Sequence, residues 1–215
     1  MFYDGSLTGP QFLAALCCRL GVIPRHLDIL PVVCGCGVTV TTPEKYFGHI
    51  FLCDKLSRIT HTYRHNLVRD SIAMVARSFG ITVSKEPTCY VYPDAKRRPD
   101  LLFHTLPTPI AIDVTIVSPE EGPGDAAKSA EERKVKTHQT HVEKLQHRFL
   151  PFALESFGLI GHKAYLLIDS LSRSLPSYSC HLFKKMMLQA VASAAARGRA
   201  DTMYSAKHLR VMGFL

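Results

Sequence analysis

Two aspartates lie at or within apolar stretches of the sequence. Asp100 opens the run DLLFHTL, and Asp113 lies inside the run IAIDVTIV. An ionised carboxylate that leaves water needs a basic side chain, a metal ion or a solvated sheet edge to replace its lost hydration. Two carboxylates on neighbouring strands can hold Mg²⁺, which orients a water molecule and stabilises charge on phosphorus. The pair therefore predicts metal-dependent phosphodiester hydrolysis. The alternative is ordinary ion pairing with Arg97, Arg98 or a helix lysine.

RPD and IDVT resemble the PD-(D/E)xK nuclease motif, in which a lysine two residues after the second acid completes the site. Position 115, which follows Asp113 by two residues, is Thr and carries no charge. The helix predicted over residues 126–147 offers a replacement, because Lys134 falls on its apolar stripe and Lys136 on its polar face. The stripe consists of Ala127, Ala130, Lys134, His138, Val142 and Leu145. We expect Lys134 to face the sheet as the missing lysine and His138 to be a packed histidine.

Four residues upstream have the spacing of metal ligands. They form C-x-C followed by H-x-x-x-C, and they are Cys34, Cys36, His49 and Cys53. Thiolate and imidazole groups in a set of four suit tetrahedral Zn²⁺ in a structural site. His61 and His65 are alternative ligands. The alternative without metal is a group of reduced cysteines beside a surface histidine.

The elements around these residues predict an α/β fold. A helix over residues 66–80 ends at Gly80 and carries an apolar face of Val68, Ile72, Val75 and Phe79. The pattern then predicts strands over 81–92, 100–106 and 110–117, the helix over 126–147, a strand over 149–158 and an alanine-rich helix over 181–198. This order of helix, three strands, helix and strand resembles that of a restriction-endonuclease-like core.

Changes of pattern divide the chain into four parts. Residues 1–33 are predicted to be a helical lead-in, and residues 34–65 a zinc-knuckle-like Cys/His module that is too short for a hydrophobic core of its own. Residues 66–200 are predicted to be the nuclease-like domain, and residues 201–215 a C-terminal tail.

Composition narrows the class of partner and the compartment. The formal net charge of +8 favours a polyanionic partner. No apolar run approaches the roughly 20 residues of a membrane span, and no signal peptide begins the sequence, so we expect an intracellular protein that is not secreted and does not bind a membrane. Seven cysteines, an odd number, predict thiols or metal ligands rather than disulfides.

These motifs resemble the C-terminal region of site-specific non-LTR retrotransposon proteins, in which a Cys/His zinc knuckle precedes a restriction-like endonuclease of the PD-(D/E)xK type. The resemblance covers about residues 34–200 and rests on CGCG, GHIFLC, RHNLV, KEP, RRPDLLF, IDVTIVSP, the helix from Ala126 and RFLPFALESFG. It implies an endonuclease that nicks target DNA in the nucleus, with Asp100 and Asp113 as Mg²⁺ ligands, a lysine displaced onto the helix, and a zinc knuckle that aids nucleic-acid binding.

The basic residues beside these motifs are candidate contacts to phosphate. They are Arg64, His65, Lys96, Arg97, Arg98 and Lys136. DNA is the expected partner, with RNA as an alternative. Glu86, in KEP, lies either near the site or at a solvated strand end.

The sequence also departs from the family. Where the family often has two lysines before a tyrosine, this chain reads ERKVKTHQ, which leaves both Lys134 and Lys136 open as the active-site lysine. No polymerase motif occurs, so we expect a fragment, a relic or a domesticated piece. A nucleic-acid-binding module of the same fold that has lost catalysis is the second hypothesis, and a protein-interaction scaffold is the third.

Overall fold

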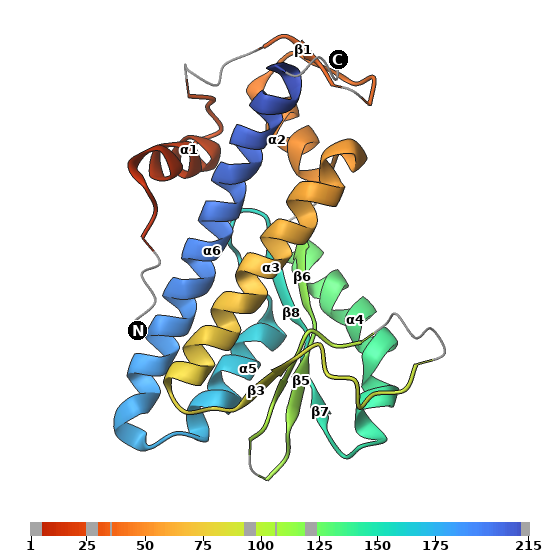
Figure 1. The fold of residues 1–215 in the computed structure, drawn as a ribbon, viewed down its shortest axis with the longest axis vertical. Helices are drawn as coiled ribbons and strands as arrows, with labels where there is room; N and C mark the ends of the chain where they lie inside the picture. The colour runs from red at the N-terminus through yellow and green to blue at the C-terminus, as the bar shows by residue number, and fades with distance from the viewer. Residues whose placement is uncertain are drawn as a thin grey trace. The chain divides into compact units, whose positions relative to one another are not determined.

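The computed structural model describes residues 6–24, 30–34, 36–92, 98–105, 107–118 and 124–211. The fold is mixed α/β, with helices and small sheets (Figure 1). Contacts divide the chain into two compact units. The sheet unit contains Val68–Ala192, and the Cys/His unit contains the described residues of Gly5–Leu67 and Ser193–Leu215. The boundaries predicted from sequence at residues 33, 65 and 200 stay predictions.

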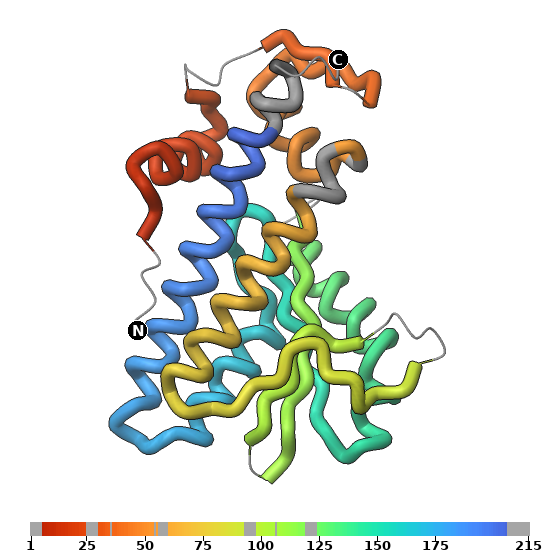
Figure 2. Tube along the Cα trace, viewed as in Figure 1, coloured from red at the N-terminus to blue at the C-terminus, as the bar shows by residue number. Residues whose placement is uncertain are grey.

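The sheet unit is built on short strands. They are β3 (Val83–Lys85), β4 (Leu101–Phe103), β5 (Ile110–Ile112), β6 (Val114–Val117), β7 (Arg148–Phe149) and β8 (Phe152–Glu155). β3 pairs antiparallel with β4, and β4 pairs antiparallel with β5. β5 pairs parallel with β7, and β6 pairs parallel with β8. Residues 110–117 and 148–155 therefore run side by side as two interrupted strands, as the trace in Figure 2 shows.

The strand predictions need correction. The strand predicted over 100–106 is limited to β4, and the one predicted over 149–158 is divided into β7 and β8 and ends at Glu155. The strand predicted over 110–117 is interrupted at Asp113, where the amide of Val114 donates to the side chain of Asp100 at 2.6 Å instead of to a strand carbonyl. The strand predicted over 81–92 covers only Val83–Lys85. It ends there because Glu86 has φ 46, in the left-handed region, and Pro87 has no amide to donate.

Helices α4 (Asp125–Glu143) and α5 (His162–Arg173) pack on this sheet, α4 against β6, β7 and β8 and α5 against β8. The predicted apolar face of the preceding helix is confirmed, since Val68, Ile72 and Val75 are buried and Phe79 packs edge-on against Phe183. The largest fully buried side chains of the sheet are Leu101, Phe103, Ile112, Phe152 and Leu154. Apolar burial at these positions is the main stabilising term for the unit.

Two helices extend beyond their predicted bounds. α3 covers Asp54–Ser78 rather than beginning at residue 66, because no Gly or Pro interrupts the sequence from Asp54 to Ser78. α6 covers Ser177–Val211, so the predicted tail is helical as far as Val211. None of the helices in the described ranges is both long and apolar enough to cross a membrane.

The Cys/His unit has a hydrophobic core, which residues 34–65 form together with residues before and after them in the sequence. Its elements include α1 (Gly9–Arg19), β1 (Val32–Val33), β2 (Thr39–Val40) and α2 (Pro43–Leu52). The predicted lead-in helix is confirmed as α1, where Thr8 forms a capping box with Gln11. The core gathers buried residues from α1, β2, α2, the C-cap of α2 and the end of α6: Ala14, Cys18, Val40, Tyr46, Phe47, Ile50, Phe51, Cys53, Ala200 and Met203. The segment is stabilised by packing that brings together distant parts of the sequence.

Candidate metal centres and their surroundings

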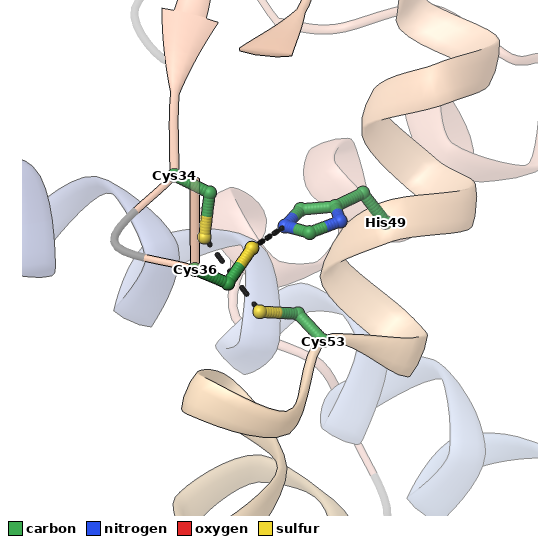
Figure 3. A group of neighbouring side chains, drawn as sticks. All are labelled: Cys34, Cys36, His49 and Cys53. Atoms are coloured by element: carbon green, nitrogen blue, oxygen red, sulfur yellow. Dashed lines mark hydrogen bonds between the residues drawn. The ribbon is translucent and has the colours of Figure 1, made fainter. Parts of the chain in front are cut away.

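The four predicted zinc ligands lie together between a hairpin and a helix (Figure 3). Cys34 and Cys36 lie in the turn between β1 and β2, where the amide of Cys34 bonds to the carbonyl of Val38 at 2.8 Å. His49 lies in the last turn of α2, and Cys53 is its C-cap. All four candidate ligand atoms lie within 4.8 Å of one another.

Two separations between ligand atoms are close to those of a tetrahedral zinc site. The Sγ atoms of Cys34 and Cys53 are 3.6 Å apart, and Cys36 Sγ is 3.5 Å from His49 Nε2. Bonds of about 2.3 Å to sulfur and about 2.0 Å to nitrogen at tetrahedral angles put S···S at roughly 3.8 Å and S···N at roughly 3.5 Å. The Cys₃His group is therefore compatible with structural Zn²⁺. His61 and His65 lie outside it, and the Nε2 atom of His61 is instead 2.5 Å from the carbonyl oxygen of Phe51.

The pKa values of three residues in this group, His49, Cys34 and Cys36, are shifted in different directions. Burial lowers the pKa of His49, which favours the neutral imidazole that binds metal. Burial raises the pKa of Cys34 to about 11. Burial also raises the pKa of Cys36, but hydrogen bonds from the backbone of Val38 and from the thiols of Cys34 and Cys53 outweigh it, so the net shift is downward. Exposed Cys36 therefore ionises more readily than Cys34.

The two aspartates meet where the strand is interrupted. The amide of Asp100 donates to the carbonyl of Ile112 at 2.9 Å, and the Oδ2 atom of Asp100 accepts from the amide of Val114 at 2.6 Å. Asp113 lies between Ile112 and Val114 in the sequence, and its side chain is only 8% exposed. Its carbonyl accepts from the amide of Phe152 at 3.0 Å, which fixes it to the neighbouring strand. The carboxylate of Asp100 and the main chain of Asp113 are therefore held by backbone hydrogen bonds.

A lysine and a histidine from α4 flank Asp113. Lys134 Nζ lies 2.5 Å from Asp113 Oδ2, and His138 Nε2 lies 3.7 Å from Asp113 Oδ1. Lys134 is half-buried, His138 is buried and Lys136 is exposed. Of the two candidate lysines, Lys134 is the one that contacts Asp113.

Behind His138 lies Tyr92, which the sequence did not single out. The hydroxyl of Tyr92 is 2.8 Å from His138 Nδ1, and burial, with the negative charge of Asp113, raises the pKa of Tyr92 to about 12. Tyr92 also packs on His141, with ring centroids 4.3 Å apart. No strand covers this segment, so periodicity could not have located Tyr92.

The basic candidates lie in different settings. Lys96 and Arg97 lie outside the described residues. Arg98 pairs with Glu86 at 3.0 Å, and Arg69 pairs with the other oxygen of Glu86 at 3.1 Å. Glu86 is thus an ion-pair partner at the strand end, and its amide donates to the carbonyl of Asp100 at 2.8 Å.

Arg64 occupies an interior position in the Cys/His unit. The residue is 5% exposed, and its guanidinium carbon is 5.1 Å from the centroid of the Phe51 ring. Burial there lowers the pKa of Arg64 to about 10, with a further contribution from the charge of Arg199. This position makes Arg64 a packing residue instead of the phosphate contact expected from sequence. His65 is half-buried, with Nδ1 3.3 Å from the side-chain oxygen of Asn66.

Two buried glutamates cap the helices of the sheet unit. Glu155 Oε1 accepts from the amides of Gly124 and Ala127 at the start of α4, at 2.8 and 3.4 Å. Glu131 Oε1, from α4, accepts from the amide of Lys163 at the start of α5 at 2.8 Å. The N-caps of α4 and α5, Gly124 and Gly161, have no side chain to do this. Glu155 lies in an apolar run of the sequence, and a buried acid needs a partner, so its contact with the start of α4 could have been anticipated from the sequence.

No family model matches the chain, and no curated protein matches it.

Proposed function

We propose that this chain is a metal-dependent DNA endonuclease that nicks its target, as the endonuclease domain of non-LTR retrotransposon proteins does. The observation that carries the proposal is the contact of Lys134 Nζ with Asp113 Oδ2 at 2.5 Å. The carboxylate of Asp100 accepts a hydrogen bond from the amide of Val114, the residue that follows Asp113. Three elements that are separate in the sequence supply these groups, and they meet at an interrupted strand.

The order of elements supports a restriction-endonuclease-like core of the PD-(D/E)xK type. α3 precedes β3, β4 and the interrupted strand of β5 and β6, and α4 then leads to β7 and β8. This is the order helix, three strands, helix, strand. The acids lie at the start of β4 and at the interruption, as that core requires.

At the proposed centre, the two aspartates and Lys134 have different roles. Carboxylate oxygens are the ligands that Mg²⁺ takes in proteins, so Asp100 and Asp113 would hold it. When bound, Mg²⁺ supplies an activated water and stabilises charge on the leaving oxygen. Lys134 brings a fixed positive charge beside Asp113, in a position to stabilise negative charge that develops on the phosphate. Thr115 has no charge with which to do this.

The Cys₃His group is proposed to bind Zn²⁺ as a structural knuckle that aids nucleic-acid binding. Its ligand separations support this assignment. Arg98 and exposed Lys136 are proposed contacts to DNA phosphates, with RNA as the alternative polyanion. The proposed substrate implies a nuclear site of action.

The test is nicking of supercoiled plasmid. Zinc-loaded protein with Mg²⁺ is expected to convert supercoiled plasmid into open circles, and Asp113→Asn, which keeps size and removes charge, is expected to lose the activity. Equal nicking by the wild type and Asp113→Asn would exclude this site.

The second candidate function is nucleic-acid binding without catalysis. Two observations favour it. Position 115 is Thr, and among the described residues no third acid, histidine or cysteine joins Asp100 and Asp113 in a group of three ligands. Salt-sensitive binding of DNA, with no cleavage in Mg²⁺ or Mn²⁺, would support this function over the first.

A further inference from the structure

Two polar side chains in series, Tyr92 and His138, reach the oxygen of Asp113 that Lys134 does not contact. The hydroxyl of Tyr92 lies 2.8 Å from His138 Nδ1, and His138 Nε2 lies 3.7 Å from Asp113 Oδ1. Lys134 contacts the other oxygen, Oδ2. The two oxygens of one buried carboxylate thus face different groups of the same helix.

The partners of His138 determine which ring nitrogen carries its proton. A neutral imidazole has one N–H donor and one acceptor nitrogen, and a phenol can fill either role. If Nδ1 donated to Tyr92, the lone pair of Nε2 would face a negative carboxylate. If Tyr92 donates to Nδ1, the N–H of Nε2 faces Asp113 Oδ1 and attracts it. The second arrangement is the favourable one in a buried setting.

Ring packing holds the imidazole of His138 in this orientation. His138 is 4% exposed and lies between the rings of Tyr92 and Phe149, with centroid distances of 5.4 and 5.2 Å. Tyr92 is in turn held by its contact with His141. At 3.7 Å the N–H and the carboxylate attract each other electrostatically without a full hydrogen bond.

We propose that Tyr92 and His138 are positioning residues that orient the carboxylate of Asp113 for a divalent cation. The inference rests on the proposed function, because it assigns these residues a role at the same acid pair. Tyr92 sets the tautomer of His138, and His138 holds Oδ1 while Lys134 holds Oδ2. Outer groups of this kind typically contribute about 10-fold to 100-fold to metal affinity.

The chain contains a matched control in the next tyrosine and histidine pair. The hydroxyl of Tyr90 lies 2.9 Å from His147 Nδ1, at nearly the same distance as in the pair of Tyr92 and His138. Within the part of the chain that the structure describes, no carboxylate forms an ion pair with His147. Tyr90→Phe and Tyr92→Phe therefore delete the same hydroxyl from the same kind of contact, and Tyr92→Phe alone affects a histidine that faces Asp113.

The experiment measures Mn²⁺ binding to zinc-saturated protein by calorimetry. Tyr92→Phe is expected to weaken binding about 10-fold, and Tyr90→Phe to leave it within about 2-fold. In the His138→Gln background, where the amide always offers donors, Tyr92→Phe is expected to have no further effect. With DNA, Tyr92→Phe should lower kcat and leave KM unchanged, since the phenol is proposed to act through Asp113 and not on the substrate.

The outcomes separate this inference from the proposed function. If the wild-type protein shows no Mn²⁺ binding that depends on Asp113, both the proposed function and the positioning role are overturned. Binding that depends on Asp113 and is reduced equally by Tyr90→Phe and Tyr92→Phe, or by neither, overturns only the positioning role. Circular dichroism of the two tyrosine variants checks that both remain folded.

Discussion

Lys134 Nζ lies 2.5 Å from Asp113 Oδ2, whereas Lys136, on the same helix, is exposed. If the proposed mechanism holds, Lys134→Ala should lower kcat for plasmid nicking by about 100-fold or more, because it removes the charge next to the acid pair. Lys136→Ala should instead raise KM and reduce the salt dependence of DNA binding. Single-turnover nicking assays across a salt series would show both effects. The opposite pattern would assign the active-site role to Lys136.

Zinc removal should loosen the Cys/His unit without abolishing its fold, because that unit has its own buried core. Wild-type protein purified without chelator should contain about one zinc per chain by elemental analysis. Cys36→Ser should lose the zinc and lower the melting temperature, since the ligand set is incomplete. Cys53→Ser should do the same, with an added cost because Cys53 is buried.

Cys89→Ser is the control for the zinc experiment. Cys89 and Cys36 are both exposed, but Cys89 lies outside the Cys₃His group. The Cys89 variant should keep wild-type zinc content. Full zinc content in Cys36→Ser would show that the group does not bind metal through all four residues.

Gly198 should not tolerate a side chain, although it lies inside a helix. A Cβ there would come 2.9 Å from Cγ and 3.3 Å from Cβ of buried Arg64, atoms near the backbone that cannot easily move. We expect Gly198→Ala to lower the free energy of unfolding by about 1 to 3 kcal/mol. Thermal or urea unfolding measures this change.

Gly48 provides the matched comparison for Gly198. It lies within α2 and would place a Cβ in open space. Gly48→Ala should raise the free energy of unfolding by about 0.5 to 1 kcal/mol, since alanine loses less backbone entropy in a helix. Destabilisation by both substitutions would argue against a specific clash with Arg64.

Stability should depend on pH through Glu131. Burial raises the pKa of this carboxyl in the folded state, despite the amides of α5 that it accepts from. Because the folded pKa exceeds the unfolded value of about 4.3, the contribution of Glu131 to stability is fully present below that value. It is lost as the pH rises through the raised folded pKa.

Glu131→Gln tests this dependence, since glutamine keeps an acceptor oxygen and does not titrate. The wild-type free energy of unfolding minus that of Glu131→Gln should fall as the pH rises from about 4 and then level off. Glu132→Gln, which removes an exposed carboxylate from the same helix, supplies the baseline. A difference that rises with pH would contradict the assignment.

Parts of the candidate site could be predicted because they depend on local spacing. Helical periodicity alone puts Lys134 and His138 on the inner face of α4 and Lys136 on the outer face. The Cys₃His group could be predicted for a similar reason, since a short hairpin and one helix bring Cys34, Cys36, His49 and Cys53 together.

Other parts depend on contacts between residues distant in sequence. The core of the Cys/His unit includes Ala200 and Met203 from α6, and the side-chain Nε2 of Gln11 donates to Asp201 Oδ1 at 3.0 Å across 190 residues. No local pattern encodes such pairing. Tyr92 was likewise missed because its segment has no regular period, and the role of His138 becomes visible only beside Tyr92 and Asp113.

The bond from the amide of Val114 to Asp100 has a thermodynamic consequence. The carboxylate of Asp100 takes the place of a strand carbonyl, so the sheet selects its rotamer in the absence of any ligand. A side chain already held in one rotamer has little conformational entropy left to lose on binding, a loss that can reach roughly 1 kcal/mol for a mobile side chain. Pre-organisation of this kind raises affinity without adding a contact. In this protein, the bond that completes the hydrogen-bond ladder at the interrupted strand is also the bond that orders Asp100.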